Sequence, residues 1–199
     1  LNAVKNAIGL SNVTITFATN GSVKPQKRLL NLLKECKLVK INVSIDAYAE
    51  RNEYIRPPLK WKKILSNLKY IRDLDYPNFV MMALSTINPL NLYYYDELYQ
   101  WITGVNEMFR EYDPKDSSDY RRVLPNRCVG SLDLQYTPQS LRDAIIEKYG
   151  AEHEISKMIS NIQKRPASSL VAYLDKWDKL RGTDWRTTFP EVVKYFEHP

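Results

Sequence analysis

Cysteine is scarce in this sequence, and long hydrophobic runs are missing. The 199 residues include two cysteines, Cys36 and Cys128, whose wide separation does not resemble the disulfide framework of a small secreted domain. No run approaches the roughly 18 consecutive apolar residues of a membrane-spanning helix, and the first residues lack the charged and then apolar order of a signal peptide. We therefore expect no membrane segment and a reducing location, with the cytoplasm as the default.

Histidine and glycine are also sparse, which limits two kinds of site. His153 and His198 have no partners at the spacing of metal ligands, so we expect no metal site built on them. A glycine-rich phosphate loop is missing as well, which argues against a barrel enzyme acting on a phosphorylated small molecule.

Apolar and charged residues are plentiful. The apolar fraction is 44% and the charged fraction 26%, which is typical of a packed globule. The formal net charge is +6, and basic residues are interspersed with acidic ones. The segment Lys60-Trp61-Lys62-Lys63 is the best candidate for a nucleic-acid contact, but it suits the solvated start of an amphipathic helix better.

Three segments in the first half of the chain have the pattern of strands. From Val13 to Ala18 larger apolar residues alternate with threonine or alanine, and Asn20-Gly21 then breaks the pattern. In the second segment, Val39, Ile41, Val43 and Ile45 share one face, while Lys40, Asn42, Ser44 and Asp46 share the other. Residues 79–84 form the third strand-like run.

Helices are expected after each of these strands. The apolar face of the first helix comprises Leu29, Leu30, Leu32, Leu33 and Cys36, and that of the second comprises Trp61, Ile64, Leu65, Leu68 and Ile71. A third helix is expected from about Tyr94 to Phe109. This alternation predicts an α/β fold with a parallel sheet. The polar face of the second strand favours a partial barrel over an open sheet covered on both sides. Three units are too few to close a barrel, so we expect further strands ahead of Leu1.

A polar connector at residues 113–119 predicts a boundary between two domains, 1–112 and 113–199. The second domain is predicted to be mainly helical. Thr137-Pro138 predicts the start of a helix, with threonine as its N-cap, and Gly150 its end. Further helices are expected at about 152–164, 168–180 and 190–196.

Candidate ligand-binding residues stand at the carboxyl ends of the predicted strands, where parallel barrels and open sheets hold their ligands. The three strand ends are Thr19-Asn20-Gly21, Ser44-Ile45-Asp46 and Ser85-Thr86-Ile87-Asn88. All three are small and polar. A strand ending in Thr-Asn-Gly, a helix, the sequence Val-Ser-Ile-Asp, and Arg56 ten residues later resemble the radical S-adenosylmethionine (SAM) superfamily over roughly Val13 to Phe109.

The resemblance implies half of a partial (β/α)6 barrel, followed by a helical extension. In that superfamily a [4Fe-4S] cluster reduces SAM, and the resulting 5′-deoxyadenosyl radical abstracts hydrogen from a substrate. The cofactor-binding residues that it implies are Thr19, Asn20, Ser44, Asp46, Arg56 and Asn88. Ser44 would contact the SAM ribose, Thr19 would line the same pocket, and Arg56 would pair with the SAM carboxylate. An alternative interpretation of Asp46 is that it holds its loop in place.

The sequence departs from the superfamily in one respect. The three closely spaced cysteines that hold the cluster are not present, and two scattered cysteines cannot replace them. We therefore expect an N-terminally truncated fragment that is inactive alone. Its expected partner is the missing N-terminal half of the barrel. The tail resembles a "twitch" extension at Leu174-Asp175, Leu180-Arg181-Gly182 and Phe189-Pro190-Glu191. By analogy with such relatives a peptide is a candidate substrate.

Some of these residues have simpler interpretations. Cys36 is expected to be a buried structural thiol, and Cys128 is also read as structural because one cysteine cannot form an auxiliary cluster. The alternative function is a non-catalytic basic module for nucleic acid or another anionic partner. Finally, an incomplete barrel exposes a strand edge, so we expect the first strand to pair with another copy or another chain.

Overall fold

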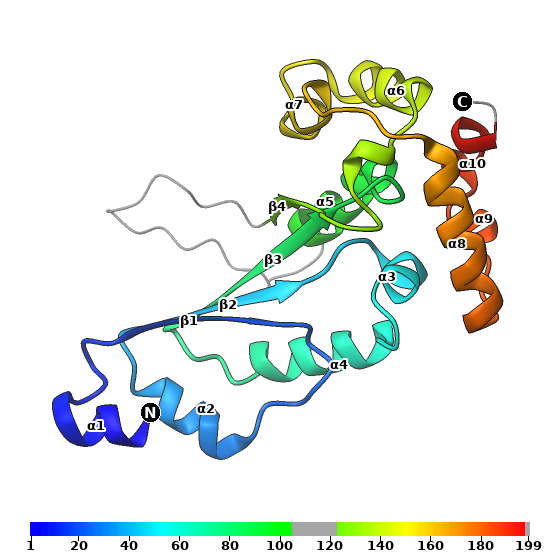
Figure 1. Cartoon of the computed structure of the whole chain (residues 1–199). Coiled ribbons are helices and arrows are strands. Elements are labelled where there is room, and N and C mark those ends of the chain that lie inside the picture. Colours follow the sequence, from blue (N-terminus) through cyan, green and yellow to red (C-terminus); the bar gives the residue numbers. More distant parts are fainter. Residues whose placement is uncertain (105–122, 198–199) are drawn as a thin grey trace. The chain divides into compact units, whose positions relative to one another are not determined.

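The computed structural model describes residues 1–104 and 123–197, which form an α/β fold (Figure 1). The strands are β1 (Thr14–Thr19), β2 (Leu38–Ser44), β3 (Phe79–Ile87) and β4 (Val123–Arg127), in the sheet order β1-β2-β3-β4. The helices are α1 (Asn2–Ile8), α2 (Lys27–Lys34), α3 (Ala49–Ile55), α4 (Trp61–Arg72), η1 (Leu92–Tyr94), α5 (Tyr95–Gly104), η2 (Leu134–Tyr136), α6 (Gln139–Tyr149), α7 (Glu154–Ser160), α8 (Ala167–Arg181), α9 (Trp185–Thr188) and α10 (Pro190–Glu197). The predicted α/β class is confirmed.

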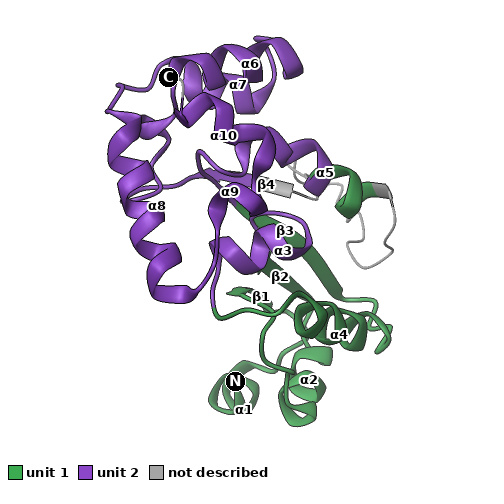
Figure 2. Cartoon of the chain, turned by 90° about the vertical axis from the view of Figure 1, so that its right-hand side faces the viewer, with its two compact units in different colours: residues 1–45, 58–85, 99–124 green, residues 46–57, 86–98, 125–199 purple. Residues whose placement is uncertain are grey.

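The chain forms two compact units that do not follow chain order (Figure 2). Unit 1 comprises residues 1–45, 58–85 and 99–124. Unit 2 comprises residues 46–57, 86–98 and 125–199, so it combines the loops that follow β2 and β3 with the C-terminal helices. The predicted domain boundary between residues 112 and 113 lies outside the described residues.

Unit 1 contains the parallel sheet predicted from the sequence. β1 pairs with β2 and β2 pairs with β3, both in parallel. Paired residues of neighbouring strands point to the same face, so Phe17, Ile41 and Met81 share one face and Thr16, Lys40 and Val80 the other. The sheet therefore has two chemically different sides.

Helices α2 and α4 lie on the same side of this sheet and contribute its core (Figure 1). The core residues of this unit are buried: Leu30 and Leu33 of α2, Val39, Ile41 and Val43 of β2, and Ile64 and Leu68 of α4. Each such side chain contributes about 1.5–3 kcal/mol on burial. The opposite face is more polar, with Thr14 and Thr16 exposed and Asn42 and Ser44 half-buried. The two-faced character predicted for β2 is confirmed.

Unit 2 is organised around a second core that the C-terminal helices supply. Its buried side chains include Leu141, Ile145, Ile155, Ile159, Leu170, Leu174, Trp185, Phe189, Val192 and Phe196. The buried Arg142 donates to the backbone oxygens of Leu134, Thr137, Ile159 and Ile162, which ties α6 to α7 and η2. These hydrogen bonds offset the free-energy cost of burying the charged guanidinium.

Several element boundaries differ from the sequence prediction. β3 continues three residues further, to Ile87, and α5 begins at Tyr95 after the short helix η1. The predicted end of that helix at Phe109 lies outside the described residues. The Thr137 cap is wrong, because Pro138 occupies the N-cap of α6 without a side-chain bond. Gly150 does end α6, at a φ of 84°.

Helix α3 was not predicted, because residues 49–55 show no apolar periodicity. The helix buries the polar Asn52 together with Tyr54 and Ile55. Within the described parts of the chain, no helix combines the length and the apolar character that a membrane crossing requires.

Candidate functional site

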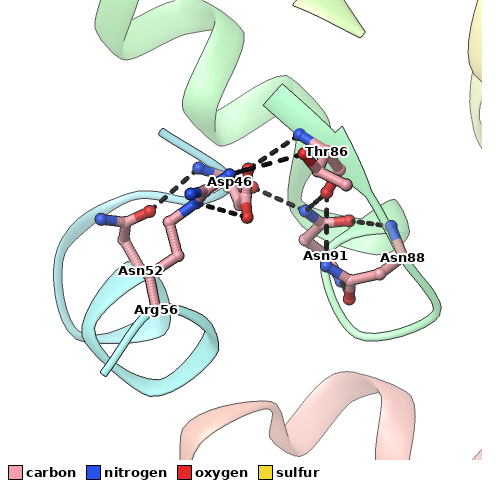
Figure 3. Close-up of polar contacts among 6 residues, drawn as sticks. All are labelled: Asp46, Asn52, Arg56, Thr86, Asn88 and Asn91. Carbon is pink, nitrogen blue, oxygen red and sulfur yellow. Dashed lines mark hydrogen bonds and ion pairs between the residues drawn. The ribbon is translucent and has the colours of Figure 1, made fainter. Parts of the chain in front are cut away.

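Asp46, which follows β2 in sequence, is the centre of a buried polar cluster in unit 2 (Figure 3). The residue is 5% exposed. Its backbone N–H donates to Asn52 Oδ1 at 2.9 Å, and its backbone oxygen accepts from Asn91 Nδ2 at 2.7 Å. Both the main chain and the side chain of Asp46 are therefore held by neighbouring loops.

The Asp46 carboxylate forms a two-pronged pair with Arg56. Arg56 Nε donates to Oδ2 at 2.6 Å and Nη2 to Oδ1 at 3.0 Å. Oδ1 also accepts from the backbone N–H of Thr86 at 2.7 Å. This fork is the geometry that makes arginine a strong carboxylate partner. Asp46 thus holds α3 and the end of β3 together, which agrees with the interpretation that it holds its loop in place.

Asn88 and Asn91 shape the loop after β3. The Asn88 N–H donates to Asn91 Oδ1 at 2.8 Å, and Asn88 Oδ1 accepts from the N–H of Leu90 at 3.0 Å. Asn91 Nδ2 also donates to the backbone oxygen of Thr86 at 3.0 Å. Both amides are thus used within the loop, in the manner typical of asparagine turns.

Two titratable groups at this cluster have shifted pKa values. Burial raises the pKa of Asp46, and the bonds from Arg56 and Thr86 oppose that rise. Burial also raises the pKa of the Cys128 thiol, with a further contribution from the negative charge of Asp46. Cys128 donates its backbone N–H to the Ile87 oxygen at 3.0 Å, so this cysteine lies beside the end of β3 with its thiol protonated at neutral pH.

Thr19 and Asn20 form a tight turn at the end of β1 in unit 1. Thr19 Oγ1 accepts from the N–H of Gly21 at 3.1 Å, and Asn20 Oδ1 accepts from the N–H of Ser22 at 3.0 Å. Gly21 has a φ of 69°, and a Cβ added there would lie 3.2 Å from the Ile64 side chain. Both predicted ligand groups are therefore engaged in local structure.

Thr19 and Ser44 lie on opposite faces of the sheet. Thr19 pairs with Val43, on the face that carries the core, whereas Ser44 pairs with Leu84 on the polar face. Asn42 shares the polar face with Ser44, and its buried Oδ1 has no hydrogen-bond partner among the described residues. A ligand that donated a hydrogen bond to this oxygen would remove the free-energy cost of leaving a buried acceptor unpaired.

The structure thus brings together Asp46, Arg56 and Asn88 of the predicted residues. It adds Thr86, which the sequence placed at the third strand end without a role, and Asn52 and Asn91, which the sequence reasoning missed. The spacing of Asn88 and Asn91 around a proline is a turn signal that could have identified one of them. In contrast, Asn52 had no signal, since its importance depends on the unpredicted helix α3.

Metal ligation has little support among the residues that the structure describes. There, no group of three or more histidine, cysteine, aspartate or glutamate side chains could hold a metal ion. Cys36 is buried, two residues after the end of α2 and not on the helix as the sequence indicated, and Cys128 is half-buried in unit 2.

Comparison with known proteins gives one match. The family model described as the radical SAM superfamily matches residues 1–102, just over half of the chain. No curated protein and no solved structure matches the sequence.

Proposed function

The chain belongs to the radical SAM superfamily, and we propose that it is part of an enzyme that binds SAM at the polar end of β2. The observation that carries this proposal is the polar face of β2, with Ser44 at the strand end and the unpartnered Oδ1 of Asn42 two residues before it. A SAM-dependent radical reaction follows at the level of the superfamily. Hydrogen abstraction from a peptide is the specific reaction that we propose.

The residues of β2 fit a nucleoside. A ribose carries hydroxyl groups that both donate and accept hydrogen bonds, and Ser44 can do the same. The Asn42 Oδ1 acceptor would receive a bond from a ribose hydroxyl or an adenine amine. We therefore assign Ser44 and Asn42 to the nucleoside part of SAM.

Arg56 has a different role from the one that its family position alone implies. Its Nε and Nη2 donors already bond to Asp46, so the residue serves first to hold the loop after β2. A guanidinium has five N–H donors, and the Arg56 side chain is 26% exposed. We propose that Asp46 keeps the guanidinium in orientation and that the exposed edge of Arg56 is available to a carboxylate.

The iron-sulfur cluster does not fit the residues of this chain. Cluster ligation needs several thiolates, and the sequence supplies two distant cysteines, one of them buried. A cluster would therefore need ligands from outside these 199 residues. We propose that the chain alone is catalytically inactive but retains part of the SAM site.

A calorimetric titration of the chain with SAM tests the proposal. We expect weak binding, with a Kd of roughly 0.1–1 mM, because an iron atom does not contribute. Ser44→Ala should weaken binding about five-fold, since one hydrogen bond is worth about 1 kcal/mol. Ser66→Ala, on the exposed side of α4, is the matched control and should leave the Kd unchanged. Equal affinities for the two variants would refute the assignment.

The alternative function, a basic module for nucleic acid, would need an aromatic side chain that is exposed to the bases. Trp61 is buried, and its ring packs against Trp101 at a centroid distance of 4.9 Å. The segment then offers only lysines, and phosphate binding through lysines weakens steeply with salt. A filter-binding titration with a single-stranded oligonucleotide at 50 and 200 mM salt separates the two functions.

A further inference from the structure

Helix α3 and the residue that follows it are each bonded to Asp46. Asn52 Oδ1 accepts from the Asp46 N–H at 2.9 Å, and Arg56, directly after the helix, forks onto the Asp46 carboxylate. Any movement of α3 must therefore move the Arg56 guanidinium or break these bonds. The placement of α3 decides where Arg56 lies.

Tyr54, between these two residues, bonds to the C-terminal helices instead. Its hydroxyl donates to Asp178 Oδ1 at 2.9 Å, and Arg181 Nη1 donates to its backbone oxygen at 3.1 Å. Its ring packs edge-on against Phe189 at 5.4 Å between centroids. Burial and the Asp178 charge raise the pKa of the Tyr54 hydroxyl, which keeps the proton for this bond.

Asp178 is itself fixed. Its Oδ2 accepts from the backbone N–H of Trp185 at 2.7 Å, and its Oδ1 accepts from Thr183 Oγ1 at 2.7 Å. The carboxylate therefore joins the end of α8 to the start of α9, and Tyr54 attaches to this joint. Such a network holds its members more firmly than separate bonds would.

A second contact connects α3 to the last helix. Arg51 stacks over the ring of Tyr94 at 3.9 Å and pairs with Glu97 at 2.6 Å. The Tyr94 hydroxyl in turn donates to Glu191 of α10. All of these residues belong to unit 2, in which the loop of residues 46–57 clusters with the C-terminal helices.

We infer that Tyr54 is a positioning residue through which helices α8 and α9 fix α3 and thereby the Asp46–Arg56 pair. The C-terminal helices then determine the position of the loop after β2. The coupling stands on the contacts within unit 2. Its consequence for SAM rests on the function proposed above.

Tyr54→Phe tests this inference, because it removes the bond to Asp178 and keeps the ring on Phe189. Tyr95→Phe is the matched control, since it removes a similar tyrosine–carboxylate bond, to Glu154 at 2.8 Å, that does not involve α3. Hydrogen exchange of the Asp46 amide and the NMR signal of Arg56 Nε–H report on the pair directly. Amides of α6 report on the stability of unit 2 as a whole.

We expect Tyr54→Phe to accelerate exchange at the Asp46 amide about five-fold more than at the α6 amides, and to shift and broaden the Arg56 Nε–H signal. Tyr95→Phe should change neither signal at the pair. Equal acceleration at Asp46 and in α6, or an unchanged Arg56 signal, would overturn the inference. These readouts need no SAM, so a chain that failed to bind SAM would refute the proposed function and leave this result standing.

Discussion

At the scale of single residues, Asp46 is the side chain on which the candidate site depends most. It connects two segments of unit 2, residues 46–57 and 86–98, through its carboxylate and its backbone groups. The sequence placed Asp46 at a strand end and Arg56 ten residues later, but not in contact with each other. Contact between them depends on the bend that α3 introduces, and residues 49–55 have no apolar period that predicts it.

Replacement of Asp46 by alanine should destabilise the fold. The change leaves Arg56 without its partner and the Thr86 N–H without an acceptor, and we expect a loss of about 2–3 kcal/mol, less than for a fully buried pair because Arg56 is partly exposed. Urea unfolding measures this. Asp73→Ala, which breaks the exposed pair with Arg72, should cost under about 0.5 kcal/mol. Similar losses in both variants would contradict the role of Asp46.

Acid should destabilise unit 2 through its paired carboxylates. The hydrogen bond from Arg186 lowers the pKa of Asp175, and the bond from Tyr94 lowers that of Glu191. A lowered pKa contributes stability above the ordinary value of about 4, and this contribution is lost as the pH falls through the folded pKa. Burial raises the pKa of Asp46, so protonation of this carboxyl does not add to the loss of stability in acid.

We therefore expect the urea midpoint to fall between about pH 5 and pH 3, and Asp175→Asn to reduce that fall. A midpoint that stays level, or an Asp175→Asn variant with an unchanged slope, would show that these pairs contribute nothing.

At the scale of elements, the sequence predicted the strands and helices of unit 1 well. β2 and α4 have strong periods of two and 3.6 residues, and their apolar faces are the buried ones. The sequence did not predict that Thr19 and Ser44 lie on opposite faces. The alternation already puts Thr19 in phase with Phe17, and the observed register pairs it with Val43 on the apolar face, opposite Ser44. The prediction placed both residues at one pocket because it considered strand ends and not strand faces.

The turn after β1 depends on glycine for two reasons. Gly21→Ala would place a side chain at positive φ and only 3.2 Å from Ile64, so we expect a loss of about 2 kcal/mol. Gly182 also has a positive φ of 65° but has open space around it, so Gly182→Ala should cost only about 1 kcal/mol. Thermal unfolding of both variants compares the two. A cost at Gly21 no greater than at Gly182 would mean that the contact with Ile64 is unimportant.

At the scale of the whole molecule, the grouping of the two loops with the C-terminal helices is the feature that sequence reasoning could not reach. Residues 46–57 join unit 2 through contacts to residues more than 100 positions away, such as Tyr54 with Asp178. Local periodicity holds no information on such pairs. The composition shift near residue 113 marked a change of pattern, which is a different property from a division between packed units.

Strand β1 lies at one end of the sheet order, and Thr14, Thr16 and Ala18 are exposed. Edge strands of this kind pair with other chains. We predict that sedimentation velocity will detect dimers that increase with protein concentration, and that Thr16→Lys will reduce them. A chain that stays monomeric at millimolar concentration would contradict this prediction.

The central claim is that the end of β2 contacts SAM, and a titration of the ¹⁵N-labelled chain with SAM, followed by NMR, tests it most directly. We predict saturable shifts of the Asn42 and Ser44 amides, which Ser44→Ala reduces, while the amides of α1 stay in place. Shifts confined to other residues, or an unchanged spectrum at millimolar SAM, would contradict the claim.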